Sequence, residues 1–262
     1  MAPSCIIGYL YGNLMNLYGD RGNIMALAGR CHRRGIECRI VPIGIGDEIP
    51  VRECDLYFFG GGQDQEQARV AEDLVGRGEK AARLREALEE GAVALCVCGG
   101  YQLLGRYYRP HGQPELPGAG IIDCWTIAGP TRFIGNVLVA ADLSWSGAHA
   151  AGSRSPTLVG FENHSGRTYL GPAARPLGRV LIGGGNNGAD GTEGAVMQVG
   201  RGWAIGTYLH GPLLPKNPHL ADTLIRLALR RRHGDVELPP LDDRLEWEAH
   251  EAVAGRARAL RR

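Results

Sequence analysis

The sharpest chemical signal in the sequence is a cysteine at the junction of a buried strand and a helix. The apolar run at residues 92–98 leads into Gly99 and Gly100, and a helical pattern follows from Tyr101. This arrangement predicts a nucleophile elbow that places the Cys98 thiol at the carboxyl edge of a sheet, where ligands bind in open α/β folds. The positive end of the helix favours a thiolate, and the Gly99 N–H is expected to face an oxyanion.

Two histidines compete to be the base that a cysteine nucleophile needs. Of the eight histidines, His164 and His210 each end a strand-like run just before a turn that contains glycine. Both are expected to reach the same edge of the sheet as Cys98. Position alone favours His210 only modestly, so His164 remains open at this point.

Glycine makes up 40 of the 262 residues, and two clusters stand out. Gly60, Gly61 and Gly62 lie between a strand and a helix, where backbone N–H groups can approach an anion, although a plain tight turn has the same signature. The run at residues 183–191 lacks a Gly-Lys-Ser/Thr sequence, and its Asn-Gly and Asp-Gly steps are typical of hairpins and long loops. We therefore expect no ATP site in this chain.

These residues need a parallel sheet to position them, and the first hundred residues predict one. Apolar runs alternate with helical patterns, as in βαβ units. The predicted strands are 5–10, 37–43, 55–59 and 92–98, and the predicted helices are 23–34, 65–90 with a break near Gly76 and Gly78, and 101–106.

The second half predicts more antiparallel strands. Strand-like runs occur at 120–127, 132–140, 157–162, 180–182, 195–199 and 203–209, with one convincing helix at 217–232. We expect a single α/β domain over residues 4–232, with a mixed, mostly parallel central sheet flanked by helices. A polar loop and a charged C-terminal helix are expected over residues 233–262.

Composition excludes several classes of protein. The 29 Lys and Arg balance 28 Asp and Glu, which gives no reason to expect nucleic-acid binding. No run of 18 apolar residues and no targeting segment is visible, so we expect no membrane insertion. The seven cysteines are an odd number without a disulfide or metal-site pattern, which favours the reducing cytoplasm, a buried core role for the six other than Cys98, and no metal.

Two motifs carry a resemblance to a known family. Val97-Cys-Gly-Gly-Tyr-Gln-Leu-Leu104 and Tyr208-Leu-His-Gly-Pro212 resemble the triad glutamine amidotransferases, in the cobyric-acid-synthase-like branch. The resemblance runs from the first strand to about Arg232. Four further segments resemble the glutaminase subunits of lipid II isoglutaminyl synthases: Leu17-Tyr-Gly-Asp-Arg-Gly-Asn23, Phe59-Gly-Gly-Gly-Gln-Asp-Gln65, Arg132-Phe-Ile-Gly-Asn136 and Gly160-Phe-Glu-Asn-His-Ser-Gly-Arg-Thr168.

The resemblance implies a role for each site residue. Cys98 resembles the nucleophile that attacks the side-chain amide of L-glutamine, and His210 the base. Arg132 matches the arginine that holds the substrate, and Gln102 is expected to line the same pocket. The oxyanion hole is assigned to Gly61, Gly62 and Gly99. His164 and Glu162, in a Glu-x-His-x-Gly pattern, are expected to be structural or to support the site from behind.

The resemblance also implies a partner. In this family the glutaminase chain carries no cofactor and passes ammonia to a Mur-ligase-like subunit, which binds ATP and Mg and amidates the D-glutamate of the peptidoglycan stem peptide. The two chains are expected to form a hetero-oligomer.

One position departs from the family pattern. Many glutamine amidotransferases carry a glutamate two residues after the catalytic histidine, where this chain has Pro212. Either the site is a Cys–His dyad, or a carboxylate from elsewhere orients the imidazole, with the partner subunit as one source. An acid from the partner would make the isolated chain a poor glutaminase.

Three alternatives remain open. The first is an amidotransferase that serves another synthase, such as one that amidates corrinoids, where the same domain is usually fused to an ATP-using domain that this chain is too short to include. A non-catalytic binding module on the same scaffold is a second reading, although such a module has no need for Cys98, His210 and Arg132 together. A γ-glutamyl hydrolase without ammonia transfer is the third.

Overall fold

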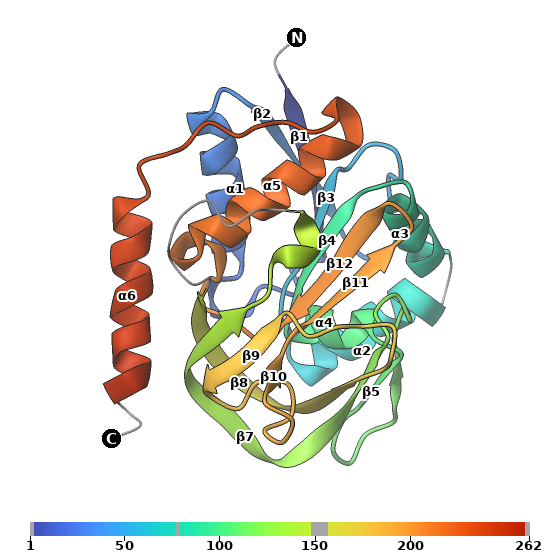
Figure 1. Cartoon of the computed structure of the whole chain (residues 1–262). Coiled ribbons are helices and arrows are strands. Elements are labelled where there is room, and N and C mark those ends of the chain that lie inside the picture. Colours follow the sequence, from blue (N-terminus) through green and yellow to red (C-terminus); the bar gives the residue numbers. More distant parts are fainter. Residues whose placement is uncertain (1–2, 77–78, 148–156, 260–262) are drawn as a thin grey trace.

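The computed structural model describes residues 3–76, 79–147 and 157–259 (Figure 1). Its helices are α1 (Arg21–Arg33), α2 (Asp64–Ala71), α3 (Lys80–Glu89), α4 (Gly99–Leu104), α5 (Pro218–His233) and α6 (Arg244–Ala259), with a π-helical turn, η2 (Glu72–Gly76), and 3₁₀ turns η1 (Leu17–Gly19), η3 (Ser144–Ser146) and η4 (Leu214–Lys216). Its strands are β1 (Ser4–Leu10), β2 (Glu37–Ile43), β3 (Leu56–Phe59), β4 (Val93–Val97), β5 (Tyr107–Arg109), β6 (Leu116–Pro117), β7 (Cys124–Ala141), β8 (Thr157–Leu170), β9 (Gly178–Ile182), β10 (Thr192–Glu193), β11 (Ala195–Val199) and β12 (Gly202–Thr207).

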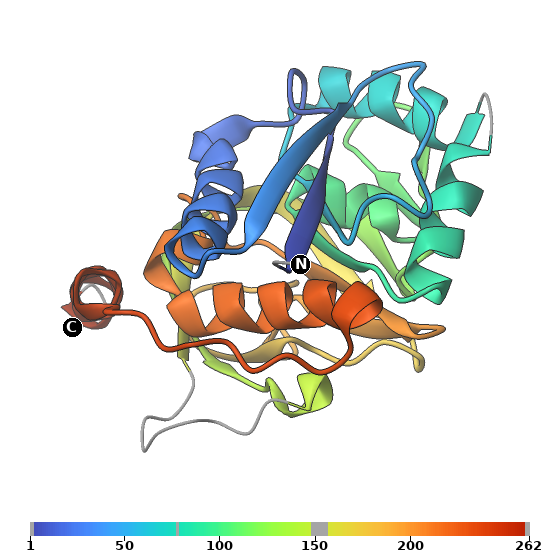
Figure 2. The same ribbon diagram turned by 90° about the horizontal axis from the view of Figure 1, so that it is seen from above.

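The central sheet has the strand order β11-β12-β4-β3-β1-β2 and is parallel except for β11. Strands β3 and β4 are buried along their whole length, which explains their unbroken apolar sequences. Figures 1 and 2 show α1 and α5 on one side of this sheet and α2 and α3 on the other. The mixed, mostly parallel sheet flanked by helices is therefore confirmed.

A second sheet covers the carboxyl edge of the first. Its order is β10-β9-β7-β5-β6, with β8 paired to β7 along an antiparallel ladder. A bulge between Ala128 and Phe133 bends β7 without ending it, so the strands predicted at 120–127 and 132–140 belong mainly to one long strand. Bulges allow this because the extra residues leave the ladder and rejoin it.

The C-terminal helix α6 packs on β7, β8 and η4, at the side of the molecule (Figure 1). Its approach is fixed by Arg30 of α1, which is 3% exposed and forms ion pairs with Asp222 of α5 (2.7 Å) and Asp243 (2.6 Å), just before α6. The Trp247 ring stacks on His219 with centroids 5.2 Å apart. Within the described ranges, no helix has the length and apolar character needed to cross a membrane.

Candidate active site

Cys98 lies at a strained turn between β4 and α4. Its backbone has φ 50° and ψ −105°, and Tyr11 is the other non-glycine residue with a positive φ among the residues described. A cysteine in this region of φ/ψ space costs on the order of 1–3 kcal/mol, so the surrounding structure must hold it there. The Cys98 N–H donates to the Thr207 carbonyl at the end of β12 (2.9 Å). The elbow predicted from the strand–turn–helix pattern is present.

His210 is held beside the elbow by the second sheet. Its backbone exchanges two hydrogen bonds with Phe161 of β8, at 2.9 and 3.1 Å. Its buried side chain lies against Gly61, where an added β-carbon would be 2.9 Å from Cε1 of His210 and 3.3 Å from Cβ of Cys98. The fold thus brings the two chemical groups of the predicted nucleophile–base pair to the same place.

Opposing effects set the charge on the His210 imidazole. Burial disfavours the charged ring and by itself lowers the pKa. The Cys98 sulfur and the Asp20 carboxylate beside the ring outweigh burial and raise the pKa of His210 to about 10. The surroundings of the ring therefore favour its protonated form.

Asp20 is a site residue that the sequence analysis did not identify. It lies between η1 and α1, is fully buried, and places Oδ1 3.3 Å from Nδ1 of His210. The family's glutamate two residues after the histidine is replaced by Pro212 here, and Asp20 is a carboxylate from elsewhere in the chain that lies beside the imidazole. The sequence feature that could have identified Asp20 is its place in the Leu17–Asn23 segment, which carries part of the resemblance.

The glycine turn at residues 60–62 is hydrogen-bonded to Asp20 and to the start of α4. Its Gly61 N–H donates to Oδ2 of Asp20 (2.8 Å), and the Gly60 carbonyl accepts the Gly100 N–H (3.1 Å). The expectation that Gly61 supplies an oxyanion donor stays a prediction, and in this structure its N–H is engaged by Asp20. Gly62 and Gly99 keep that role as predictions.

Two buried glutamine side chains form hydrogen bonds close to the predicted catalytic residues. Gln67 of α2 donates from Nε2 to the Gly62 carbonyl (3.0 Å) and was not foreseen, although it follows the glycine turn by five residues. Gln102, one turn past Cys98, donates from Nε2 to the Tyr208 hydroxyl (3.1 Å). Its predicted role in lining the substrate pocket remains a prediction.

Arg132 lies at the bulge of β7, on the exposed side of the hairpin. Its guanidinium donates to the side-chain oxygen of Asn163 on β8 (2.9 Å) and to the Asn163 carbonyl (3.3 Å). These contacts fix the head of the arginine at the bulge. The assignment of Arg132 to glutamine binding stays a prediction.

The second candidate histidine, His164, has a different environment. Its ring stacks on Tyr208 with centroids 3.6 Å apart, and Nδ1 is bonded to the Gly166 carbonyl (2.9 Å). Burial lowers the pKa of His164 below its usual value. The neighbouring Glu162 carboxylate accepts the N–H groups of Gly184 and Gly185, at 2.8 to 3.0 Å. The side chains of His164 and Glu162 therefore contribute to the packing of β8 against its neighbours.

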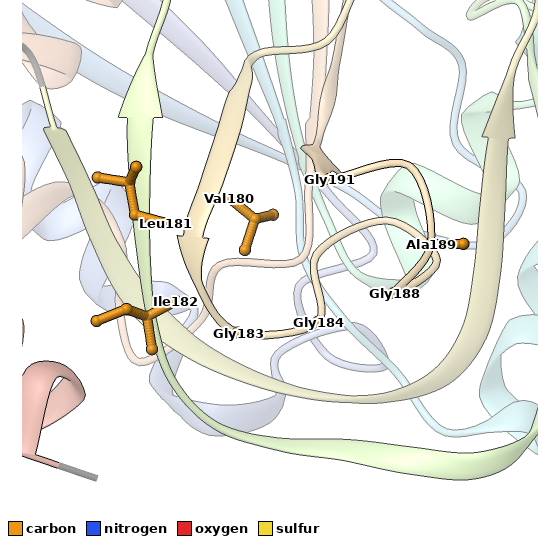
Figure 3. Close-up of a pocket in the computed structure, with 8 residues that line it drawn as sticks. All are labelled: Val180, Leu181, Ile182, Gly183, Gly184, Gly188, Ala189 and Gly191. Carbon is orange, nitrogen blue, oxygen red and sulfur yellow. The ribbon is translucent and has the colours of Figure 1, made fainter. Parts of the chain in front are cut away.

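The glycine-rich loop after β9 borders a separate cavity of about 360 Å³ (Figure 3). Aliphatic side chains of β9 and backbone of the loop line it: Val180, Leu181, Ile182, Gly183, Gly184, Gly188, Ala189 and Gly191. This lining holds no acid, base or nucleophile. Across the described ranges, no three His, Cys, Asp or Glu side chains gather in a way that could hold a metal ion.

The parallel sheet and the elbow at Cys98 are typical of α/β enzymes that use a side-chain nucleophile, and comparison with known proteins gives the family. Residues 6–218 match the model of the CobB/CobQ-like glutamine amidotransferase domain. The chain belongs to this family and is a glutamine amidotransferase.

Two of the relatives are subunits of one kind of synthase. The chain is 38% identical over 251 residues to "Lipid II isoglutaminyl synthase (glutamine-hydrolyzing) subunit GatD" of Staphylococcus aureus, which covers 96% of this chain and 95% of the relative. It is 36% identical to the protein of that name from Streptococcus pneumoniae, over 94% of this chain and 88% of the relative. Among solved structures, PurLQS from Thermotoga maritima superposes with a TM-score of 0.55 at 15% identity, covering 87% of this chain and 96% of that one, which shows the shared fold.

Proposed function

We propose that this chain is the glutaminase subunit of a lipid II isoglutaminyl synthase. It hydrolyses L-glutamine to glutamate and ammonia in the cytoplasm, and it delivers the ammonia to a Mur-ligase-like synthetase chain of the MurT type. That partner, with ATP and Mg, amidates the D-glutamate of lipid II to D-isoglutamine. The names and near-complete coverage of the two relatives support this assignment.

The observation that carries the proposal is the pairing of a strained elbow cysteine with a buried imidazole. The Cys98 sulfur attacks the side-chain amide carbon of glutamine, and His210 carries the thiol proton to the departing nitrogen, which leaves as ammonia. The products of this step are a γ-glutamyl thioester on Cys98 and free ammonia. Water activated by His210 then cleaves the thioester to glutamate and the free thiol.

The developing negative charge on the amide oxygen needs donors that are already in place. The assigned donors are the backbone N–H groups of Gly62, in the glycine turn, and of Gly99, which follows Cys98 directly. The Gly99 position is tightly packed, since an added β-carbon would lie 2.8 Å from Nε2 of Gln67 and 2.9 Å from Cε of Met15. This packing keeps the donor geometry fixed through the reaction.

The experiment measures glutamate release from glutamine by the chain alone and with a co-expressed Mur-ligase-like partner. Wild type is expected to release glutamate in at least one preparation, and Cys98→Ala to release none in either. Cys38→Ser is the matched control because Cys38 lies away from the site on β2. Full glutamate release by Cys98→Ala would refute the nucleophile assignment.

A second arm tests the acceptor. With ATP, Mg, glutamine and lipid II, the wild-type pair is expected to form amidated lipid II, detected by mass spectrometry. The pair carrying Cys98→Ala is expected to do so only when ammonium is supplied instead of glutamine. Glutamate release without amidation of lipid II by any tested partner would keep the glutaminase and reject the acceptor.

A further inference from the structure

The C-terminal helix α6 is joined to the two segments on either side of the His210 loop through one buried imidazole. His250 of α6 is 1% exposed. Its Nδ1 lies 2.8 Å from the Lys216 carbonyl of η4, and its Nε2 lies 2.8 Å from Oγ1 of Thr157, the first residue of β8. A carbonyl oxygen only accepts, so Nδ1 donates, and in a neutral ring Nε2 then accepts from the Thr157 hydroxyl. One side chain therefore ties α6 to both η4 and β8.

Both of these segments lead to the backbone of His210. On the η4 side, Nζ of Lys216 donates to the carbonyl of Gly211, the residue that follows the histidine. Gly211 has φ 89°, and a β-carbon there would lie 3.5 Å from Nζ of Lys216 and 3.7 Å from Cβ of Phe161. On the β8 side, Phe161 forms the two backbone hydrogen bonds that hold His210. The backbone of residues 210 and 211 is thus fixed by the two segments that His250 joins.

Asn217 joins η4 to β8 independently of α6. Its side chain is fully buried, and Nδ2 donates to the carbonyls of Val159 (2.8 Å) and Leu213 (2.7 Å). Loss of the His250 contacts therefore leaves the two segments connected, and it removes only the contribution of α6. This separation makes the role of the helix accessible to point substitution.

We propose that α6 positions the catalytic histidine, with His250 and Lys216 as the positioning residues. Neither residue contacts the reacting atoms, and together they fix the peptide that follows His210 so that its imidazole stays within reach of Cys98. The family match ends at residue 218, so α6 lies beyond the matched domain and acts on the site from outside it. This inference deepens the proposed function and rests on it for the reaction, whereas the contacts do not depend on the identity of the substrate.

The test uses His250→Leu and Lys216→Met in the full chain, alone and in complex with its synthetase partner. Both substitutions remove the polar contacts and keep most of the side-chain volume. We expect each to lower kcat for glutamate release by about 10–100-fold, since a shift of roughly 1 Å in a catalytic group has an effect of this size, with KM for glutamine changed by less than about threefold. His250→Asn keeps an N–H donor for the Lys216 carbonyl and is expected to recover most of the lost kcat.

Ala254→Gly is the matched control on the same helix. Ala254 is 1% exposed and packs with Leu138 and Val159, away from the contacts of His250. Glycine inside a helix is destabilising, so this variant is expected to have a lower melting temperature while kcat stays within about twofold of wild type. A merely structural role for α6 predicts a different pattern, in which all variants, Ala254→Gly included, lose kcat in proportion to their loss of melting temperature.

A second readout needs no glutamine. The rate of Cys98 alkylation by iodoacetamide is followed against pH, because the thiolate is the reactive form and a neighbouring imidazolium stabilises it. His250→Leu and Lys216→Met are expected to move this profile to higher pH, since they displace the imidazole, whereas Ala254→Gly leaves it in place. A profile that stays in place in both variants overturns the proposal, and so does a kcat within threefold of wild type in both. If wild type releases no glutamate with or without the partner, the proposed function fails, and the alkylation profile still decides whether α6 positions His210.

Discussion

Gly61 and His210 approach so closely that the glycine cannot carry a side chain without displacing the imidazole. A β-carbon at Gly61 would lie 2.9 Å from Cε1 of His210, closer than non-bonded carbons normally come. The glycine at this position is thus tied to the position of the His210 imidazole, and not only to the shape of a turn.

Gly61→Ala is therefore expected to reduce kcat/KM for glutamine hydrolysis by about 100-fold, the cost of shifting a catalytic group by roughly 1 Å. The matched control is Gly29→Ala in α1, where an added β-carbon meets no atom within 4 Å. The control is expected to keep wild-type kcat/KM and to stabilise the helix by about 0.5–1 kcal/mol, seen as a higher melting temperature. Wild-type kinetics in Gly61→Ala would show that the imidazole is not confined there.

Cys98 is expected to be the one rapidly alkylated cysteine. Burial raises the pKa of the Cys54, Cys96 and Cys124 thiols, and a hydrogen bond to Cys31 together with burial raises the pKa of the partly exposed Cys38. Peptide mapping after brief treatment with iodoacetamide at neutral pH should locate the label on Cys98.

Substitution by serine checks this assignment. The fast phase of labelling is expected to vanish in Cys98→Ser and to persist in Cys38→Ser, and glutamine should slow it in wild type. A fast phase that survives in Cys98→Ser would place the reactive thiol elsewhere.

Arg132 gives a prediction about substrate affinity. Loss of a charge-assisted contact to the α-carboxylate of glutamine costs about 1.5–3 kcal/mol, so Arg132→Ala should raise KM by roughly 10–100-fold with little change in kcat. Arg132→Lys should recover only part of the affinity, because lysine cannot form the paired contacts of a guanidinium. The control is Arg109→Ala, which removes an exposed arginine paired with Glu115. An unchanged KM in Arg132→Ala would assign substrate binding to other residues.

Glu193 predicts a pH dependence of folding. Burial raises the pKa of Glu193 from 4.5 to about 7, although its hydrogen bonds from Thr207 and Tyr208 act in the opposite direction. The folded chain therefore keeps this proton over a pH range in which the unfolded chain has released it. Its contribution to the free energy of unfolding falls by about 3 kcal/mol as the pH rises from about 4.5 through 7.

Chemical denaturation at several pH values tests this. The free energy of unfolding of wild type should fall relative to that of Glu193→Gln over that range, because the glutamine cannot titrate. The exposed Glu86→Gln on α3 is the control and should show no such trend. A constant difference between wild type and Glu193→Gln would mean that folding does not raise the pKa of this carboxyl group.

Much of the α/β fold could be predicted from the sequence, because parallel strands that are buried on both faces have unbroken apolar sequences. The predicted strands 55–59 and 92–98 contain β3 and β4, which are buried along their whole length, and the elbow after β4 followed from two glycines behind such a run. The full length of β7 could not be predicted from the sequence. Its bulge passes through Gly129 and Pro130, residues that ordinarily signal the end of a strand.

The acid beside His210 could not be found by searching the sequence around the histidine. Asp20 and His210 are 190 residues apart, and they meet only because α1 starts where β12 delivers the histidine loop. That meeting depends on the order of strands and on side-chain packing, as at Gly22 against Pro212. Neither is encoded in a local pattern.

The ion pairs of Arg30 join the two ends of the translated chain, since Asp222 and Asp243 follow it by 192 and 213 residues. At about 5–20 residues per second, a ribosome synthesises Asp243 roughly 10–40 s after Arg30. The αβ units that carry Cys98 have by then left the exit tunnel, while the arginine still lacks its second counter-charge. Closure of this network therefore requires the synthesis of residue 243, so α6 docks only after the strands that frame Cys98 have been synthesised.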